Sequence, residues 1–174
     1  KKINKFNKII TVSGDKSLSI RWLLFSSLAN GKSKAKNLLL SQDVIATLNA
    51  IQTLGIKAKI YKNECVVYGR GFNGYKYRKN IVIDAKNSGT LGRLILGLLI
   101  NSPNRIKLIG DKSLSNRDFN RIVDPLSKFG AKFKFNKTKN LPLSILGSEN
   151  LKPINYLENR GSAQCKSSII FAGM

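Results

Sequence analysis

A glycine turn at residues 87–93, with the sequence Asn-Ser-Gly-Thr-Leu-Gly-Arg, has the residue types and spacing of an anion-binding site. It follows an apolar, strand-like run at 81–83 and leads into a helix-like run at 94–100. Such a turn leaves backbone N–H groups free at a helix N-terminus, where the helix dipole also favours negative charge. Arg93 adds a fork of donors that matches a phosphate or a carboxylate. We therefore expect this turn to bind a small anion.

Two other segments repeat this combination of a glycine, a small hydroxyl residue and a cation before an apolar run. Residues 13–21 precede the run 22–28, and residues 159–166 precede the run 167–172. A single turn of this kind is often only a connection, but three of them in one chain indicate a function. The sequence predicts three helix starts that face a shared pocket for phosphorylated or carboxylated ligands.

The elements that must position these turns follow from an internal repeat. Residues 43–60 reappear 75 positions later as residues 118–135, each with apolar residues at helical spacing, a glycine at the helix end and an alternating strand. Asp43 and Asp118 are expected to be N-caps or first-turn acids. In the second copy, the pattern predicts strands at 81–83, 105–108, 131–135 and 143–146, and helices at 89–100 and 118–129.

The expected fold class is α/β, built from repeated βαβαββ units. Two full units, at about 13–78 and 79–150, are followed by the start of a third at 151–174, and together these residues form one incomplete repeat domain. Repeat units bury their faces on their neighbours. Because the last residues lie within an apolar helix, we expect the chain to be a fragment of a longer protein.

The composition limits the classes of function that this chain can have. The 174 residues are 42% hydrophobic, which suffices for a core, and the net charge of +22 invites a nucleic-acid partner. However, the cations are 23 Lys and 8 Arg, dispersed along the chain without alternating aromatic residues. We therefore expect no nucleic acid as a partner, and a basic nucleic-acid-binding module remains an alternative function.

Cysteine and histidine usage excludes zinc sites and histidine-based nucleophiles within this chain, which has two Cys and no His. Cys65 and Cys165 lack metal-ligand spacing, so we expect neither a metal nor a cofactor. The longest apolar run, 94–100, is too short to span a membrane, and residues 1–8 are too charged for a signal-peptide core. No membrane partner and a cytoplasmic location are expected.

Four motifs, at 14–21, 87–93, 110–117 and 162–167, resemble those of the 5-enolpyruvylshikimate-3-phosphate synthase family in order and approximate spacing. The resemblance implies transfer of the enolpyruvyl group of phosphoenolpyruvate to the 5-hydroxyl of shikimate 3-phosphate, through a tetrahedral intermediate and with release of phosphate. It also implies a monomeric parent enzyme, and a strand at residues 1–12 that belongs to the other domain of that enzyme.

The resemblance further implies roles for residues that match the motifs. It implies shikimate 3-phosphate binding by Lys16, Ser17, Arg21, Ser162, Ala163 and Gln164. It implies phosphoenolpyruvate binding by Lys16, Gly89, Arg117 and Gln164. It implies supporting roles for Asn87, Thr90 and Arg93. The acid and base of the family match nothing in this chain, so we expect no catalytic residue here and no activity from the chain alone.

Four residues of this chain differ from the family pattern. Ser13 replaces a common Pro, Ile20 a polar residue, and the pair Asp118-Phe119 a Pro-Met pair. An acid beside Arg117 is expected to neutralise part of its charge. The sister transferase that acts on UDP-N-acetylglucosamine, kept as an alternative, carries Lys-Asn where this chain has Lys16-Ser17.

Overall fold

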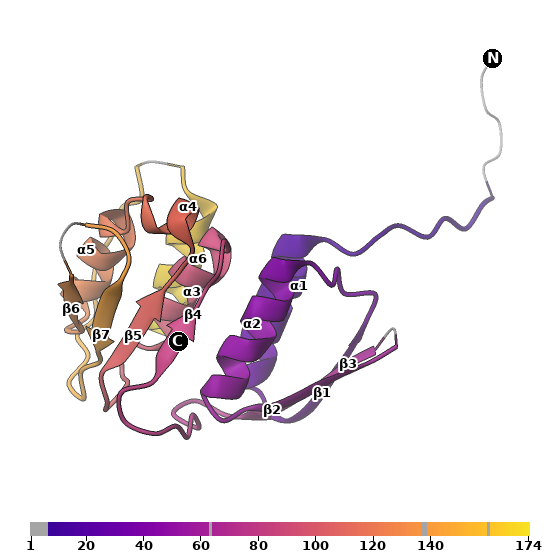
Figure 1. Cartoon of the computed structure of the whole chain (residues 1–174), viewed down its shortest axis with the longest axis horizontal. Helices are drawn as coiled ribbons and strands as arrows, with labels where there is room; N and C mark the ends of the chain where they lie inside the picture. Colours follow the sequence, from indigo (N-terminus) through magenta and orange to yellow (C-terminus); the bar gives the residue numbers. More distant parts are fainter. Residues whose placement is uncertain (1–6, 63, 137–138, 160) are drawn as a thin grey trace, which may run out of the picture.

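The computed structural model describes residues 7–62, 64–136, 139–159 and 161–174, which form two β-sheets and the helices packed on them (Figure 1). The first sheet is antiparallel and has the order β1 (Asn30–Lys36), β3 (Glu64–Arg70) and β2 (Lys57–Tyr61). The second has the order β4 (Val82–Asp84), β5 (Ile106–Ile109), β7 (Leu143–Leu146) and β6 (Lys132–Phe135). Only the pair β4 and β5 is parallel among these described strands.

The two sheets share a strand order, since β1-β3-β2 corresponds to β5-β7-β6. The second sheet has β4 as an additional first strand. Helices α1 (Lys16–Leu28) and α2 (Gln42–Thr53) cover one face of the first sheet and lie between it and β4 (Figure 1). Helices α3 (Gly89–Leu98), α5 (Asn120–Lys128) and α6 (Ala163–Gly173) pack against one another in the second half.

One continuous core joins the two halves. Every residue of α3 is buried, so this helix is the centre on which α1, α2, α5 and α6 pack. Helix α1 contributes Ile20, Leu23 and Leu24 to the same cluster of apolar side chains. Because α3 is surrounded, the N-terminal turn of this helix is held rigidly by the core beneath it.

Side-chain caps define where the helices begin. The carboxylate of Asp15 accepts the N–H of Leu18 at 2.7 Å, and the hydroxyl oxygen of Ser88 accepts the N–H of Leu91 at 3.2 Å. The hydroxyl of Ser162 caps α6 in the same way. These bonds satisfy only some of the free N–H groups of each first turn, so donors remain for an anion.

The glycines predicted to end the repeated helices do so. Gly55 follows α2 with φ +85°, and Gly130 follows α5 with φ +113°. This left-handed backbone favours glycine because other residues carry a Cβ that is strained there. Asp43 lies in the first turn of α2, as expected. The same expectation is wrong for Asp118, because the N-cap of α5 is Phe119 and Asp118 lies one residue before it, where its carboxylate accepts the N–H of Asn120 at 2.8 Å.

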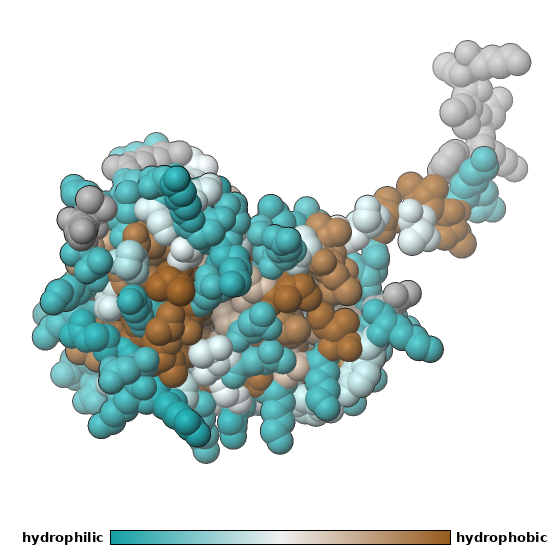
Figure 2. Space-filling view, viewed as in Figure 1, coloured by the Kyte–Doolittle hydropathy of each residue, from teal (hydrophilic) through white to brown (hydrophobic). Residues whose placement is uncertain are grey.

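The prediction of a mixed α/β fold is confirmed, and the strands and helices of residues 81–146 lie within a few residues of their predicted bounds. A short helix, α4 (Lys112–Ser115), was not predicted. Residues 1–12, which the resemblance assigns to a strand of the other domain, form no strand in their described part, 7–12, and residues 1–6 lie outside the described residues, so pairing with that domain stays a prediction. Ile9 is 99% exposed, and Figure 2 shows this apolar stretch leading away from the body. A strand requires a neighbour to pair with, and here this segment has none among the described residues.

Candidate functional site

The predicted anion turn lies between β4 and α3, at the buried start of that helix. A Cβ placed on Gly89 would lie 2.8 Å from Nη1 of Arg93 and 3.0 Å from Nη1 of Arg117. Two guanidinium groups therefore approach this glycine from different elements, and only the absence of a side chain leaves them room. Together with the free N–H groups of the helix start, they form a site of concentrated positive charge.

Arg93 is the buried member of this pair, with 4% of its surface exposed. Its Nη1 donates to Oε1 of Gln164 at 2.6 Å and reaches the carbonyl of Gly89 at 3.5 Å. Burial first, and then repulsion from Arg121 and Arg117, lowers the pKa of Arg93 to about 10. Desolvation and neighbouring cations both disfavour the charged form, and together they outweigh the opposite effect of Asp118.

Arg117 is exposed and follows α4. Its Nη2 donates to Oδ1 of Asn87 at 3.4 Å, and Nδ2 of Asn87 donates to Oδ2 of Asp111 at 2.6 Å. The N–H of Leu114 and the Asn87 amide hold the pKa of the Asp111 carboxyl below its ordinary value. Asn87 thus joins the anion turn to the turn that carries Arg117, which fits the supporting role expected for Asn87.

Gln164 connects α6 to α3. Besides accepting from Arg93, it donates from Nε2 to Oγ1 of Thr90 at 3.0 Å. Ser162 caps α6 and Ala163 is exposed immediately before Gln164. The start of α6, which is the third predicted helix start, therefore lies directly against the start of α3.

The first predicted helix start also reaches α6. Arg21 donates from Nη2 to Oγ of Ser167 at 3.1 Å and from Nη1 to the carbonyl of Ser17 at 3.3 Å. Lys16 instead makes an ion pair with Asp43, in which Nζ and Oδ2 lie 3.1 Å apart. The structure thus brings α1, α3 and α6 together near their starts, and in Figure 1 α1 and α6 both begin at the upper edge of the molecule.

Comparison with known proteins identifies the family. The family model for EPSP synthase (3-phosphoshikimate 1-carboxyvinyltransferase) matches residues 1–174. This chain belongs to the EPSP synthase family. It is 40% identical to the 3-phosphoshikimate 1-carboxyvinyltransferase of Enterococcus faecalis over 166 residues, which are 95% of this chain and 39% of that protein. It is 42% identical to the Streptococcus uberis enzyme of the same name, again over 95% of this chain and 39% of that protein.

Solved structures agree with this membership. The EPSP synthase of Acinetobacter baumannii superposes with a TM-score of 0.88 at 37% identity, over 94% of this chain and 37% of that chain. The chain thus spans about two fifths of the length of the relatives that it matches, as 39% and 40% coverage of two of them shows.

The structure shows the surroundings of three of the four residues that depart from the EPSP synthase pattern. Ile20 is fully buried in the core beneath α1. The Asp118 carboxylate accepts the N–H of Asn120 just before α5, and no ion pair joins it to Arg117 among the described residues. Phe119 is also fully buried, and its ring lies 5.5 Å from the Arg93 guanidinium. Phe119, which replaces the Met of the family pattern, therefore contacts the guanidinium of Arg93.

Sequence reasoning missed several contacts of this site. The hydroxyl of Ser168 donates to the carbonyl of Arg93 at 2.9 Å, and Ser167 and Asp43 bind Arg21 and Lys16. Ser167 was quoted only as part of a motif. Ser167 lies three residues after Gln164, so the two side chains are on neighbouring turns of α6. This spacing could have predicted that Ser167 also lies at the site.

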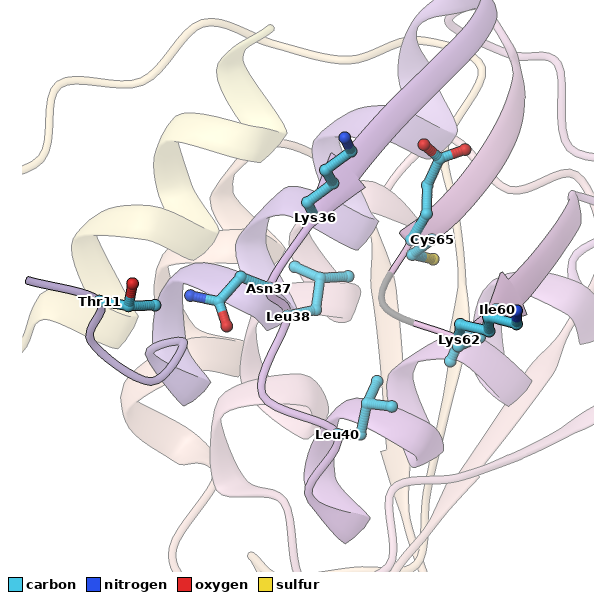
Figure 3. A pocket seen from close by; sticks show the side chains of 9 residues that line it. Thr11, Lys36, Asn37, Leu38, Leu40, Ile60, Lys62 and Cys65 are labelled. Carbon is cyan, nitrogen blue, oxygen red and sulfur yellow. The ribbon is translucent and has the colours of Figure 1, made fainter.

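A cavity of about 380 Å³ lies elsewhere, beside the loop that joins β1 to α2 (Figure 3). Leu38, Leu40 and Ile60 line it together with the cations Lys36 and Lys62. None of its lining residues belongs to the predicted anion site. Within the described ranges, no cluster of three metal-ligating side chains occurs, and no helix is long and apolar enough to cross a bilayer.

Proposed function

We propose that this chain provides part of an enolpyruvyl-transfer site for phosphoenolpyruvate and shikimate 3-phosphate. In this reaction the 5-hydroxyl of shikimate 3-phosphate gives up its proton and its oxygen bonds to C2 of phosphoenolpyruvate, while C3 gains a proton. Loss of that proton and of phosphate then leaves the enolpyruvyl ether. Both substrates are small anions, and the observation that supports the proposal is the meeting of cations and helix starts at α6.

Each substrate has its own set of proposed binding residues, and two residues belong to both sets. We assign shikimate 3-phosphate to Lys16, Ser17, Arg21, Ser162, Ala163 and Gln164, and phosphoenolpyruvate to Lys16, Gly89, Arg117 and Gln164. Ser17 and Arg21 lie four residues apart on α1, so both can face one phosphate. The ammonium group of Lys16 has three N–H donors, so it can bind both ligands while it keeps its ion pair with Asp43.

The domain organisation remains part of the proposal. We infer two βαβαββ units, at about 13–78 and 79–150, and the start of a third at 151–174. The shared strand order of the two sheets supports this reading. Residues 1–12 are proposed to pair with another domain, because the apolar residues Ile9, Ile10 and Val12 are exposed.

The test joins this chain at Met174 to the part of the Enterococcus faecalis enzyme that follows its matched segment. We expect phosphate release that requires both phosphoenolpyruvate and shikimate 3-phosphate, and none from the 174-residue chain alone. Release with UDP-N-acetylglucosamine in place of shikimate 3-phosphate would favour the sister transferase. A folded joined protein without release in either mixture would contradict the proposal.

The nucleic-acid alternative has its own test. A basic module would bind random DNA or RNA with an affinity that falls steeply as salt rises, because binding releases counterions. We propose that this chain has no nucleic-acid partner. Salt-sensitive binding of micromolar or tighter affinity that survives Gly89→Ala would favour the alternative.

A further inference from the structure

The side-chain amide of Gln164 has two unlike ends, an oxygen that only accepts hydrogen bonds and an NH₂ group that only donates them. Under the proposed function this amide contacts two anions, and only the N–H end can bind them. Rotation of the amide by half a turn would present oxygen instead. The orientation of Gln164 therefore decides whether it attracts or repels its ligands.

Two neighbours on α3 set this orientation. Nη1 of Arg93 donates to Oε1 of Gln164 at 2.6 Å, and the charge of the donor strengthens the bond. Nε2 of Gln164 donates to Oγ1 of Thr90 at 3.0 Å, which uses one of its two hydrogens and leaves the second for a ligand. In a rotated amide the NH₂ group would face a guanidinium, which also only donates.

Arg93 is itself held in place. Its guanidinium lies over the face of the fully buried Phe119 ring at 5.5 Å, and its carbonyl accepts the hydroxyl of Ser168 at 2.9 Å. At Gly89, a side chain would displace it, because a Cβ there would lie 2.8 Å from Nη1. The Phe119 ring and the bond to Oε1 therefore hold the guanidinium beside Gln164.

Stability alone does not account for this arginine. Arg93 makes no ion pair among the described residues, its Nε has no hydrogen-bond partner, and Arg117 and Arg121 repel its charge. A buried charge without a carboxylate is unfavourable, and an apolar residue of similar size is often tolerated better. Such a residue is expected where its charge serves a ligand or another side chain.

We propose that Arg93 is a positioning residue that fixes the amide of Gln164 with its N–H end toward the bound anions. This inference rests on the proposed function for the identity of the anions. The orientation of the amide can nevertheless be measured without turnover.

The kinetic test is a double-mutant cycle in the joined protein. If Arg93 acts through Gln164, Arg93→Met and Gln164→Met should each lower kcat/KM by roughly 10- to 100-fold, and the double variant should be within about threefold of the worse single variant. Arg105→Met, which removes an exposed arginine outside the site, is the matched control and should leave kcat/KM unchanged. Losses that multiply in the double variant would overturn the proposal, because Arg93 would then act independently.

A second comparison separates orientation from folding. Arg93→Lys keeps a cation and should recover part of the loss, mainly through a lower KM than in Arg93→Met. Thr90→Val removes an acceptor but not the orienting donor, so it should cost less than Arg93→Met. A larger loss from Thr90→Val would assign the orientation to Thr90 and refute the inference.

Nuclear magnetic resonance of the 174-residue chain gives the readout that needs no activity. The side-chain NH₂ signals of Gln164 should be widely separated and slow to exchange in the wild type, and should collapse toward ordinary glutamine positions in Arg93→Met. Inorganic phosphate should shift these signals in the wild type only. Unchanged signals in a folded Arg93→Met chain would overturn the proposal, whereas a joined protein without turnover would count against the proposed function only.

Discussion

Arg21 on α1 and Arg93 on α3 occupy equivalent places in the two halves of the molecule. Each donates to the carbonyl four residues before it, in Ser17 and in Gly89, and each also reaches a side chain of α6. They differ in environment, since Arg21 is half-buried and Arg93 is buried. The same local design therefore yields an accessible cation in one half and an enclosed one in the other.

The difference arises from what precedes and surrounds each helix. Strand β4 leads directly into α3, whose residues are all buried. No strand precedes α1 among the described residues, and Lys16 and Leu18 on its first turn are exposed. The comparison teaches that the duplicated turn fixes hydrogen-bond geometry, whereas the neighbouring elements determine burial and hence the strength of each charge.

The largest expected effect comes from Gly89→Ala in the joined protein. The added Cβ would displace the guanidinium groups of Arg93 and Arg117, so kcat/KM for phosphoenolpyruvate should fall about 100-fold or more. The equivalent change in the first half, Ser17→Ala, adds no volume and should cost less than about tenfold. Steady-state kinetics with each substrate varied check both values. Equal losses from the two variants would mean that the halves do not differ as described.

Arg21→Met should have the next largest effect, on the other substrate. Loss of a charged donor to phosphate should raise KM for shikimate 3-phosphate roughly 10-fold to 100-fold. KM for phosphoenolpyruvate should change much less, because the proposal assigns Arg21 to shikimate 3-phosphate only. Arg117→Met should show the opposite preference, and an identical pattern in the two variants would contradict the assignment of these two arginines to different substrates.

Substitution of Phe119 or Ile20, two buried residues that differ from the family pattern, should lower the stability moderately. Phe119→Leu removes core volume and the ring face beneath Arg93, and should lower the free energy of unfolding by about 1–3 kcal/mol. Ile20→Val, in the core of the first half, should cost about 1 kcal/mol. Urea unfolding of the 174-residue chain measures both. A smaller loss from Phe119→Leu than from Ile20→Val would argue against support of Arg93 by the ring.

The smallest effect concerns pH. Because the folded pKa of Asp111 is lowered by the Leu114 N–H and the Asn87 amide, its contribution to stability is present above the ordinary carboxyl pKa. That contribution is lost as pH falls through the lowered folded value. Carboxyl chemical shifts followed from pH 7 downward should give a midpoint below the ordinary value of 3.8. In Asn87→Ala the midpoint should move upward, and an unchanged midpoint would remove Asn87 as a cause.

Much of the fold could be predicted from the sequence, because apolar residues at helical or alternating spacing mark α3, α5 and β7 directly. Helix α4 was missed because four residues are too few to show a period. The strand at residues 1–12 was expected to pair with the other domain of the parent enzyme, so it stays a prediction although residues 7–12 form no strand here.

For the site, the duplicated turns predicted which residues would gather, and Arg93, Gln164 and Thr90 are indeed in contact. Their unequal burial could not be predicted, since it depends on how α6 packs against α3. The ion pair of Lys16 with Asp43 could not be predicted either, because it joins two helices and no motif specifies how they pack.

Helix α6 contacts both arginines through Gln164 and Ser167, which are three residues apart. A rotation or shift of this one turn would lengthen both hydrogen bonds at the same time. Under the proposed function, a ligand that moves this turn of α6 would alter both hydrogen bonds, and any coupling between the two anion turns that results would be reciprocal.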